Sequence, residues 1–131
     1  MKAACQCGQL TADLPENSLI TIACHCIACQ RRTGAPFGVL AYYRRDQVAI
    51  GGEAKSYKRT SAERNAVETF FCPICGSTVY LTLGKQPDLI GIAVGAIADP
   101  ALRAPVWSVC EQSKHHWIAM PENVQHFEHG D

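Results

Sequence analysis

Short apolar segments separated by turn-forming residues dominate the chain, and this pattern predicts strands more often than helices. Only residues 27–33 and 99–103 have the spacing of one or two helical turns. Proline, glycine and asparagine mark the turns between the apolar segments. Five segments rich in β-branched or aromatic residues are expected to be strands, namely residues 19–24, 37–43, 67–71, 78–83 and 89–94.

The connections between these predicted strands are short. Short connections favour antiparallel pairing, because parallel strands need a long crossover. The sequence contains no internal repeat, no low-complexity tract and no linker. We therefore expect one mainly β domain over residues 1–131.

Composition restricts the class of protein. The chain has 131 residues, and its twelve basic residues balance twelve acidic ones, so no charge excess indicates a nucleic acid partner. The longest uncharged apolar stretch, residues 89–98, has half the length of a membrane span. Lys2 is not followed by the apolar run of a secretory signal. We expect a cytoplasmic protein that binds neither nucleic acid nor membrane.

Seven of the eight cysteines fall into three tight clusters. In the cytosol thiols stay reduced, and clustered cysteines bind metal more often than they form disulfides. Cys-x-Cys neighbours cannot bridge each other without strain, although disulfides between clusters stay open as an alternative. An iron–sulfur cluster is a further alternative, but the familiar ferredoxin spacings are absent. The clusters are Cys5 and Cys7, then Cys24, Cys26 and Cys29, then Cys72 and Cys75.

The first and third clusters share more than their cysteines. Cys5-Gln6-Cys7-Gly8 and Cys72-Pro73-Ile74-Cys75-Gly76 both end in Cys-Gly. Glycine at that position allows a tight turn that aims backbone N–H groups at a ligating sulfur. Two such turns facing each other would supply four thiolates and close a tetrahedral zinc site. Zinc bound there would contribute directly to folding, because it would join two distant segments.

The middle cluster, Cys24-His25-Cys26-Ile27-Ala28-Cys29, supplies only three thiols and leaves one coordination position open. If the strand continues to Cys26, the side chains of Cys24 and Cys26 share one face and His25 has the other. Cys29 then lies near the start of the predicted helix, whose N–H groups favour the thiolate. A thiolate-rich zinc is a weak Lewis acid that suits a soft ligand, so we expect it to capture a substrate thiol.

Two further residues bear on this open site. His25 could supply a fourth ligand, but the alternation of side chains favours a supporting or surface position. Cys110 has no partner spacing and is expected to be a small buried residue, unless the fold brings it beside the second metal. His115, His116, His126 and His129 have no ligand spacing with one another.

These motifs resemble the glutathione-dependent formaldehyde-activating enzyme (GFA) family, whose domain is shared with centromere protein V. The resemblance runs from Cys5 to about Trp117. It rests on the two Cys-Gly motifs and on the segment from Cys24 through Arg31 to Phe37. It implies a β-tent of short twisted antiparallel sheets pinned by a structural zinc.

The resemblance also implies a metal arrangement and an activity. Cys5, Cys7, Cys72 and Cys75 would hold structural zinc, and Cys24, Cys26 and Cys29 a second, catalytic zinc. The activity is condensation of formaldehyde with glutathione to S-(hydroxymethyl)glutathione, a carbon–sulfur lyase reaction in reverse. The chain departs from the family pattern at Pro105, where a histidine is common, and this departure leaves the substrate open.

A pocket for glutathione, the expected small-molecule partner, needs cationic groups for its carboxylates. Arg31 and Arg32 follow Cys29 directly and are the candidates for binding it, and the simpler interpretation of each is a solvated surface charge. A non-catalytic zinc scaffold and a redox-sensing module are alternatives to the enzyme. The sequence leaves the oligomeric state open. Further cationic options are Arg44, Arg45, Lys58 and Arg59.

Overall fold

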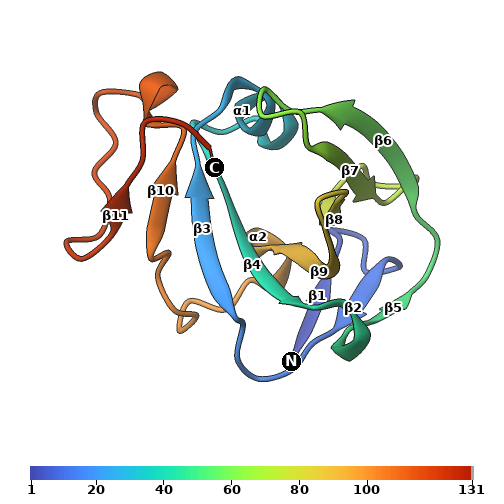
Figure 1. The fold of residues 1–131 in the computed structure, drawn as a ribbon. Helices are drawn as coiled ribbons and strands as arrows, with labels where there is room; N and C mark the ends of the chain where they lie inside the picture. Colours follow the sequence, from blue (N-terminus) through green and yellow to red (C-terminus); the bar gives the residue numbers. More distant parts are fainter. Residues whose placement is uncertain (131) are drawn as a thin grey trace.

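A computed structural model describes residues 1–130, which form two β-sheets and short helices (Figure 1). The small sheet has the strand order β1-β2-β5, and the large one has the order β11-β10-β3-β4-β9-β8-β7-β6. The large sheet is strongly curled, with β3 and β4 in one wing and β6 to β8 in the other. The strands are β1 (Lys2–Ala4), β2 (Thr11–Asp13), β3 (Ile20–Cys24), β4 (Gly38–Arg44), β5 (Ala49–Gly51), β6 (Lys55–Thr60), β7 (Ala66–Phe71), β8 (Thr78–Leu83), β9 (Gln86–Ala93), β10 (Trp107–Val109) and β11 (Gln125–His126).

The prediction of a mainly β fold is confirmed, and all five predicted strands are present with ends shifted by at most three residues. The predicted helix is α1 (Ile27–Thr33), which ends at Gly34 in the left-handed conformation. The expectation of a helix over residues 99–103 is wrong. That segment is a turn in which the Asp99 carboxylate accepts a hydrogen bond from the backbone N–H of Ala101 (2.9 Å). The helical turn lies earlier, as α2 (Val94–Ile97).

The expectation of antiparallel pairing holds for most of the strands but fails for β10, which runs parallel to both β3 and β11. Residues 98–106 follow α2 and lead the chain to the end of the sheet at which β3 begins. The chain then enters β10 from that end, so β10 has the same direction as β3. Its register places Trp107 opposite Ile22 and Val109 opposite Cys24. The end of β10 therefore lies beside the cysteine-rich end of β3.

The main core lies between the small sheet, the central strands of the large sheet and α2. Its fully buried side chains include Leu10, Tyr43, Val79 and Ile92. Burying each large apolar side chain contributes about 1.5–3 kcal/mol. Cys5 and Cys72 belong to the same cluster, with 5% and 0% of their surface exposed.

No helix in the described part of the chain is long and apolar enough to cross a membrane.

Candidate metal centres

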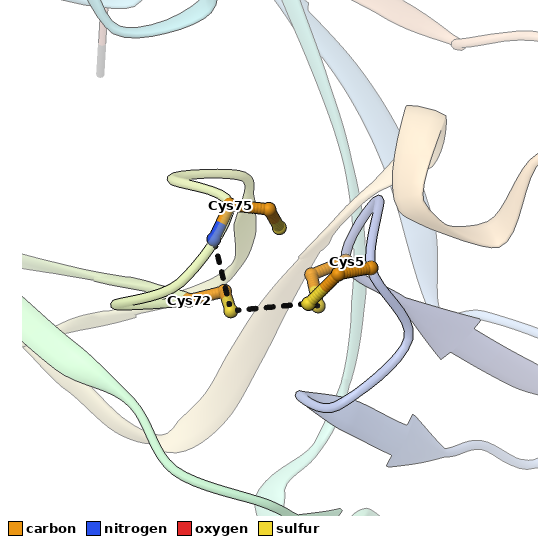
Figure 2. A group of neighbouring side chains, drawn as sticks. Cys5, Cys72 and Cys75 are labelled. Carbon is orange, nitrogen blue, oxygen red and sulfur yellow. Dashed lines mark hydrogen bonds between the residues drawn. The ribbon is translucent and has the colours of Figure 1, made fainter.

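The first centre combines four cysteines from two turns that are far apart in sequence. Figure 2 shows Cys72 and Cys75, which follow β7, facing the hairpin between β1 and β2 that carries Cys5. All four sulfur atoms lie within 4.8 Å of one another, and Cys7 Sγ is 3.7 Å from the sulfurs of both Cys5 and Cys72. A tetrahedron with metal–sulfur bonds of 2.3 Å has sulfur–sulfur edges of roughly 3.8 Å. The spacing of these thiols therefore fits a tetrahedral metal ion.

Glycine shapes both turns of the first centre, as the sequence predicts. Gly8 and Gly76 adopt φ values of 85° and 81°, which other residues rarely take. The N–H of Gly8 donates to the carbonyl of Cys5 (3.0 Å), and that of Gly76 to the carbonyl of Cys72 (2.8 Å). The two turns thus have the same construction.

Several N–H groups point at the sulfurs of the first centre. The backbone N–H of Leu10 donates to Cys5 Sγ (3.3 Å), and that of Ile74 to Cys72 Sγ (3.3 Å). The Gln9 side-chain amide also donates to Cys72 Sγ (3.0 Å). Hydrogen bonding to Ser77, whose Oγ lies 3.4 Å from Cys75 Sγ, lowers the pKa of Cys75 to about 5. Donors of this kind stabilise thiolates, the form that binds metal.

The second centre lies where β3 passes into α1. Cys24 ends the strand, Cys26 is the N-cap of the helix, and Cys29 is buried in its first turn. Their three sulfurs lie within 4.8 Å of one another. The strand ends at Cys24, as predicted, so the condition that it continues to Cys26 is not met. A helix cap, and not strand alternation, brings Cys26 to the cluster.

The sequence predicts that N–H groups at the helix start stabilise the thiolate of Cys29, but in the structure one such group points at the sulfur of Cys26. The backbone N–H of Cys29 donates to Cys26 Sγ (3.3 Å). The thiols of Cys110, Cys24 and Cys29 interact with Cys26 and lower its pKa. Interaction with the thiols of Cys24 and Cys26 instead raises the pKa of Cys29. Cys26 is therefore the sulfur of this cluster that accepts a hydrogen bond from the start of the helix.

Cys110 lies next to the second cluster, because β10 ends beside Cys24. Its thiol interacts with those of Cys24 and Cys26, and only 8% of the residue is exposed. The sequence predicts a small buried residue here unless the fold brings Cys110 beside the second metal. Cys110 is buried, and the register of β10 places it next to the second cluster.

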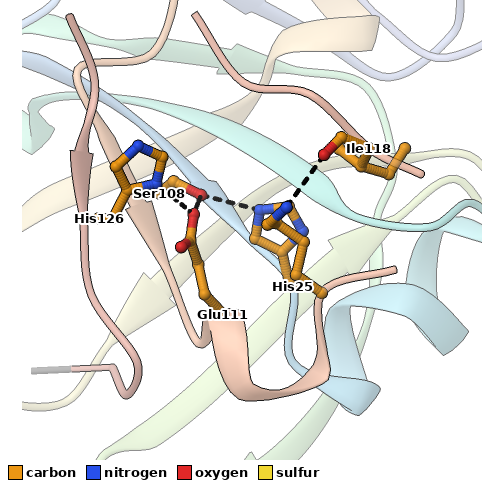
Figure 3. Close-up of polar contacts among 6 residues, drawn as sticks. His25, Ser108, Glu111, Ile118 and His126 are labelled. Atoms are coloured by element: carbon orange, nitrogen blue, oxygen red, sulfur yellow. Dashed lines mark hydrogen bonds and ion pairs between the residues drawn. The ribbon is translucent and has the colours of Figure 1, made fainter. Parts of the chain in front are cut away.

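His25 is fully buried, which excludes the surface position that the sequence left open for it. Its Nε2 lies 2.9 Å from the hydroxyl oxygen of Ser108, which in turn donates to the Glu111 carboxylate (2.6 Å). Figure 3 shows this chain of contacts continuing to His126, whose Nδ1 is 2.7 Å from the same carboxylate. Burial lowers the pKa of His25, so the ring is neutral at pH 7.

Sequence reasoning missed Ser108 and Glu111 as parts of the site. A signal existed, because Ser108 is a lone polar residue between the apolar residues Trp107 and Val109. Ser108 is in fact fully buried. Buried hydroxyls need a partner, so such a residue points to a polar network.

Gln30 ties the cysteine loop to a distant segment. Its side-chain amide donates to the backbone carbonyls of His25 (2.9 Å) and Ser113 (3.1 Å). Its carbonyl oxygen lies 2.9 Å from Nε2 of His115. This one side chain therefore fixes the loop between β3 and α1 against the region that follows β10.

The two arginines proposed to bind the substrate, Arg31 and Arg32, differ in their exposure to solvent. Arg31 is exposed, whereas Arg32 is half-buried and its Nη2 atom is buried without a hydrogen-bond partner in the described structure. A side chain at Gly38 would meet this Nη2 atom at 2.6 Å, so Gly38 leaves room for the guanidinium. Arg45 and Lys58 line a cavity of about 320 Å³ that contains no cysteine.

Comparison with known proteins bears on the family and the fold of the chain. The sequence profile of the family described as glutathione-dependent formaldehyde-activating enzyme matches residues 1–115. A crystal structure of a Rhodobacter sphaeroides protein has a similar fold, with a TM-score of 0.57 and 21% identity, covering 79% of this chain and 91% of that one. Comparison with curated proteins found no match.

The fold is mainly β, and its two clusters of thiols could hold metal ions, which places the chain in the class of proteins with candidate metal–thiolate sites. Within that class, the chain belongs to the glutathione-dependent formaldehyde-activating enzyme family.

Proposed function

We propose that the protein is a zinc-dependent carbon–sulfur lyase-type enzyme. It condenses a low-molecular-weight thiol, glutathione or a similar compound, with an aldehyde such as formaldehyde, or catalyses the reverse reaction. The observation that carries the proposal is the separate cluster of Cys24, Cys26 and Cys29 in a chain of this family. We place the activity in the cytoplasm, where the eight cysteines, all free in the structure, stay reduced.

The two clusters would hold two zinc ions with different tasks. Cys5, Cys7, Cys72 and Cys75 fit a structural ion, because their sulfurs already have tetrahedral spacing and two of them lie in the core. Cys24, Cys26 and Cys29 fit an ion that also accepts a substrate. When bound there, zinc supplies a Lewis acid that favours the thiolate form of the substrate.

The proposed reaction is chemically simple and needs few catalytic groups from the protein. A carbon–sulfur bond forms between the thiol sulfur and the aldehyde carbon, and the thiol proton ends on the carbonyl oxygen. The chain's contribution is to position the thiol and to hold the cysteine loop still. Gln30 and the contact between His25 and Ser108 fix that loop from two sides.

Arg32 is the residue we propose for the carboxylates of the thiol substrate, with Arg31 as an exposed neighbour. Both lie in the last turn of α1, one turn beyond Cys29. The Nη2 group of Arg32 is buried without a partner, and a buried N–H without a partner is costly. An incoming carboxylate would satisfy it with a charge-assisted hydrogen bond.

Native mass spectrometry of the purified chain during titration with glutathione tests the proposal. We expect two zinc ions and a saturable one-to-one adduct that Cys26→Ser abolishes. The matched control is S-methylglutathione, which keeps both carboxylates but has no thiol and should give no zinc-dependent adduct. A single permanent zinc ion, or an adduct that survives Cys26→Ser, would contradict the assignment.

A non-catalytic zinc scaffold or a redox-sensing module is the second candidate. The observation that favours it is the fourth thiol, Cys110, which interacts with the second cluster and could close it. A scaffold retains its second metal in the presence of glutathione and aldehyde without turnover. A redox sensor instead loses that zinc reversibly on treatment with peroxide.

A further inference from the structure

Cys110 reaches the second cluster through the parallel pairing of β10 with β3. Val109 pairs with Cys24 in the register of the two strands, and the backbone N–H of His25 donates to the carbonyl of Val109 (3.1 Å). Cys110 is the next residue and thus lies level with the turn that carries Cys24 and Cys26. The hydrogen bond from His25 fixes this position, because His25 lies between Cys24 and Cys26.

Three of the four thiols lie at the spacing of a metal site, and the strand register places Cys110 next to them. Four sulfurs at the corners of a tetrahedron make six pairs. Cys24, Cys26 and Cys29 lie within 4.8 Å of one another, which accounts for three pairs. Cys110 interacts with Cys24 and with Cys26, which accounts for two more. Cys110 is outside the group of sulfurs that all lie within 4.8 Å of one another, so its sulfur is farther than that from at least one of the other three.

The backbone at Cys110 has an unusual conformation. Its φ and ψ are 57° and 42°, in the left-handed region that residues other than glycine seldom occupy. Here the chain turns from β10 into the short helical turn Glu111–Ser113. This turn leaves the thiol buried beside the cluster.

The C-terminal segment covers the other side of Cys110. A side chain at Gly130 would meet Cys110 Sγ at 3.3 Å and a carboxylate oxygen of Glu63 at 2.9 Å. The backbone N–H of Glu111 donates to the carbonyl of Phe127 (3.0 Å), which holds this segment in place. Cys110 is therefore enclosed by the cluster on one side and by the chain end on the other.

We propose that Cys110 is the fourth thiolate ligand of the second metal centre, which is therefore closed by four cysteines at rest. Building on the proposed function, we further infer that a substrate thiol enters by displacing Cys110. The incoming thiol gives up one proton and the released Cys110 sulfur gains one, so the exchange leaves the charge of the site unchanged. Cys110 is the ligand to be displaced because its sulfur lies outside the group of three that are all within 4.8 Å of one another.

Cobalt substitution tests the fourth ligand directly. Thiolate-to-cobalt charge-transfer absorption grows with the number of thiolates bound to Co²⁺ in tetrahedral sites. With four thiolates at each of two centres, Cys110→Ser should lower the total absorption of the Co²⁺-loaded protein by about one eighth. Cys29→Ser, the matched variant of a cysteine in the three-thiol cluster, should lower it by the same amount.

A second variant separates ligation from backbone strain. Glycine tolerates the φ value at position 110, so Cys110→Gly relaxes the backbone while it removes the thiol. We expect Cys110→Gly and Cys110→Ser to lose equal intensity. An unchanged spectrum for Cys110→Ser beside a reduced one for Cys29→Ser would overturn the proposal, and so would wild-type intensity in Cys110→Gly.

Glutathione distinguishes this inference from the proposed function. If both hold, glutathione binds Cys110→Ser at least as tightly as wild type, and the absorption lost by that variant returns when it binds. If only the fourth ligand is correct, Cys110→Ser still loses intensity, but glutathione changes neither spectrum. If only the thiol chemistry is correct, glutathione raises the wild-type intensity and Cys110→Ser has a wild-type spectrum without it.

Discussion

The two cysteine clusters present the same chemical groups through different backbone devices. In the first, two glycine-terminated turns aim backbone N–H groups at Cys5 and Cys72, which belong to the main core. In the second, a strand end, a helix cap and a left-handed residue bring Cys24, Cys26 and Cys110 together. The first cluster is built from two turns of the same construction. The second is assembled where the strands β3 and β10 of the large sheet end.

This difference indicates which cluster can exchange ligands. A metal at the first centre would join segments about 65 residues apart, so its loss releases part of the core. The second centre is supported by hydrogen bonds that need no metal, among them the contacts of Gln30 and of His25 with Ser108. We therefore expect the fold to depend on the first metal and the chemistry on the second.

The largest predicted effect is that of Cys72→Ser, which should unfold the protein. A structural zinc in small domains contributes about 10–16 kcal/mol of apparent binding free energy, whereas whole domains are stable by about 5–15 kcal/mol. Circular dichroism and zinc analysis of the purified variant check this. Cys24→Ser is the matched control and should keep the wild-type spectrum. A folded Cys72→Ser protein that retains two zinc ions would reverse the roles of the two centres.

Chelation is a weaker perturbation than mutation. It should remove the metal of the second centre before that of the first. We expect a competing chelator to remove the second metal at least about tenfold faster than the first, a difference of about 1.4 kcal/mol in activation free energy. Zinc release followed by native mass spectrometry will show a long-lived folded species with one metal. Loss of both ions in a single step, together with unfolding, is the contrary result.

The spacing of the cysteines was enough to predict both clusters, because ligands within a few residues of each other leave a local signature. The Cys-Gly motifs likewise predicted the left-handed turns at Gly8 and Gly76. The five strong strands and α1 followed from local patterns of apolar residues. Each of these features has a local signature, although the first cluster joins two such signatures that lie about 65 residues apart.

The rest depends on register between distant strands. Cys110 has no partner spacing, and it joins the second cluster only because β10 pairs parallel with β3. The same pairing places Ser108 on His25, 83 residues away in the chain. No local pattern predicts such a register. The helix expected over residues 99–103 failed for a local reason, since the Asp99 side chain competes there for the backbone N–H of Ala101.

Removal of the support beneath the second centre should cost an intermediate amount. Ser108→Ala takes away the partner of His25 Nε2, and Nδ1 of the same buried ring already has none in the described structure. We expect a loss of about 1–3 kcal/mol in the free energy of unfolding, the cost of an unsatisfied buried polar group. Urea denaturation measures it. Ser113→Ala, whose hydroxyl is only partly buried, should lose less than about 0.5 kcal/mol.

The smallest predicted effect concerns substrate binding at α1. Arg32→Met should weaken glutathione binding about tenfold, or about 1.4 kcal/mol, because the Nη2 group without a partner offers a charge-assisted hydrogen bond to a carboxylate. Arg31→Met, one position earlier and exposed, should change the affinity by less than about twofold. Calorimetric titration measures both. Binding of 2-mercaptoethanol, a thiol without carboxylates, should be equal in wild type and both variants. Equal losses for Arg31→Met and Arg32→Met would mean that the carboxylates respond only to the summed positive charge of the two arginines and make no specific hydrogen bond with Arg32.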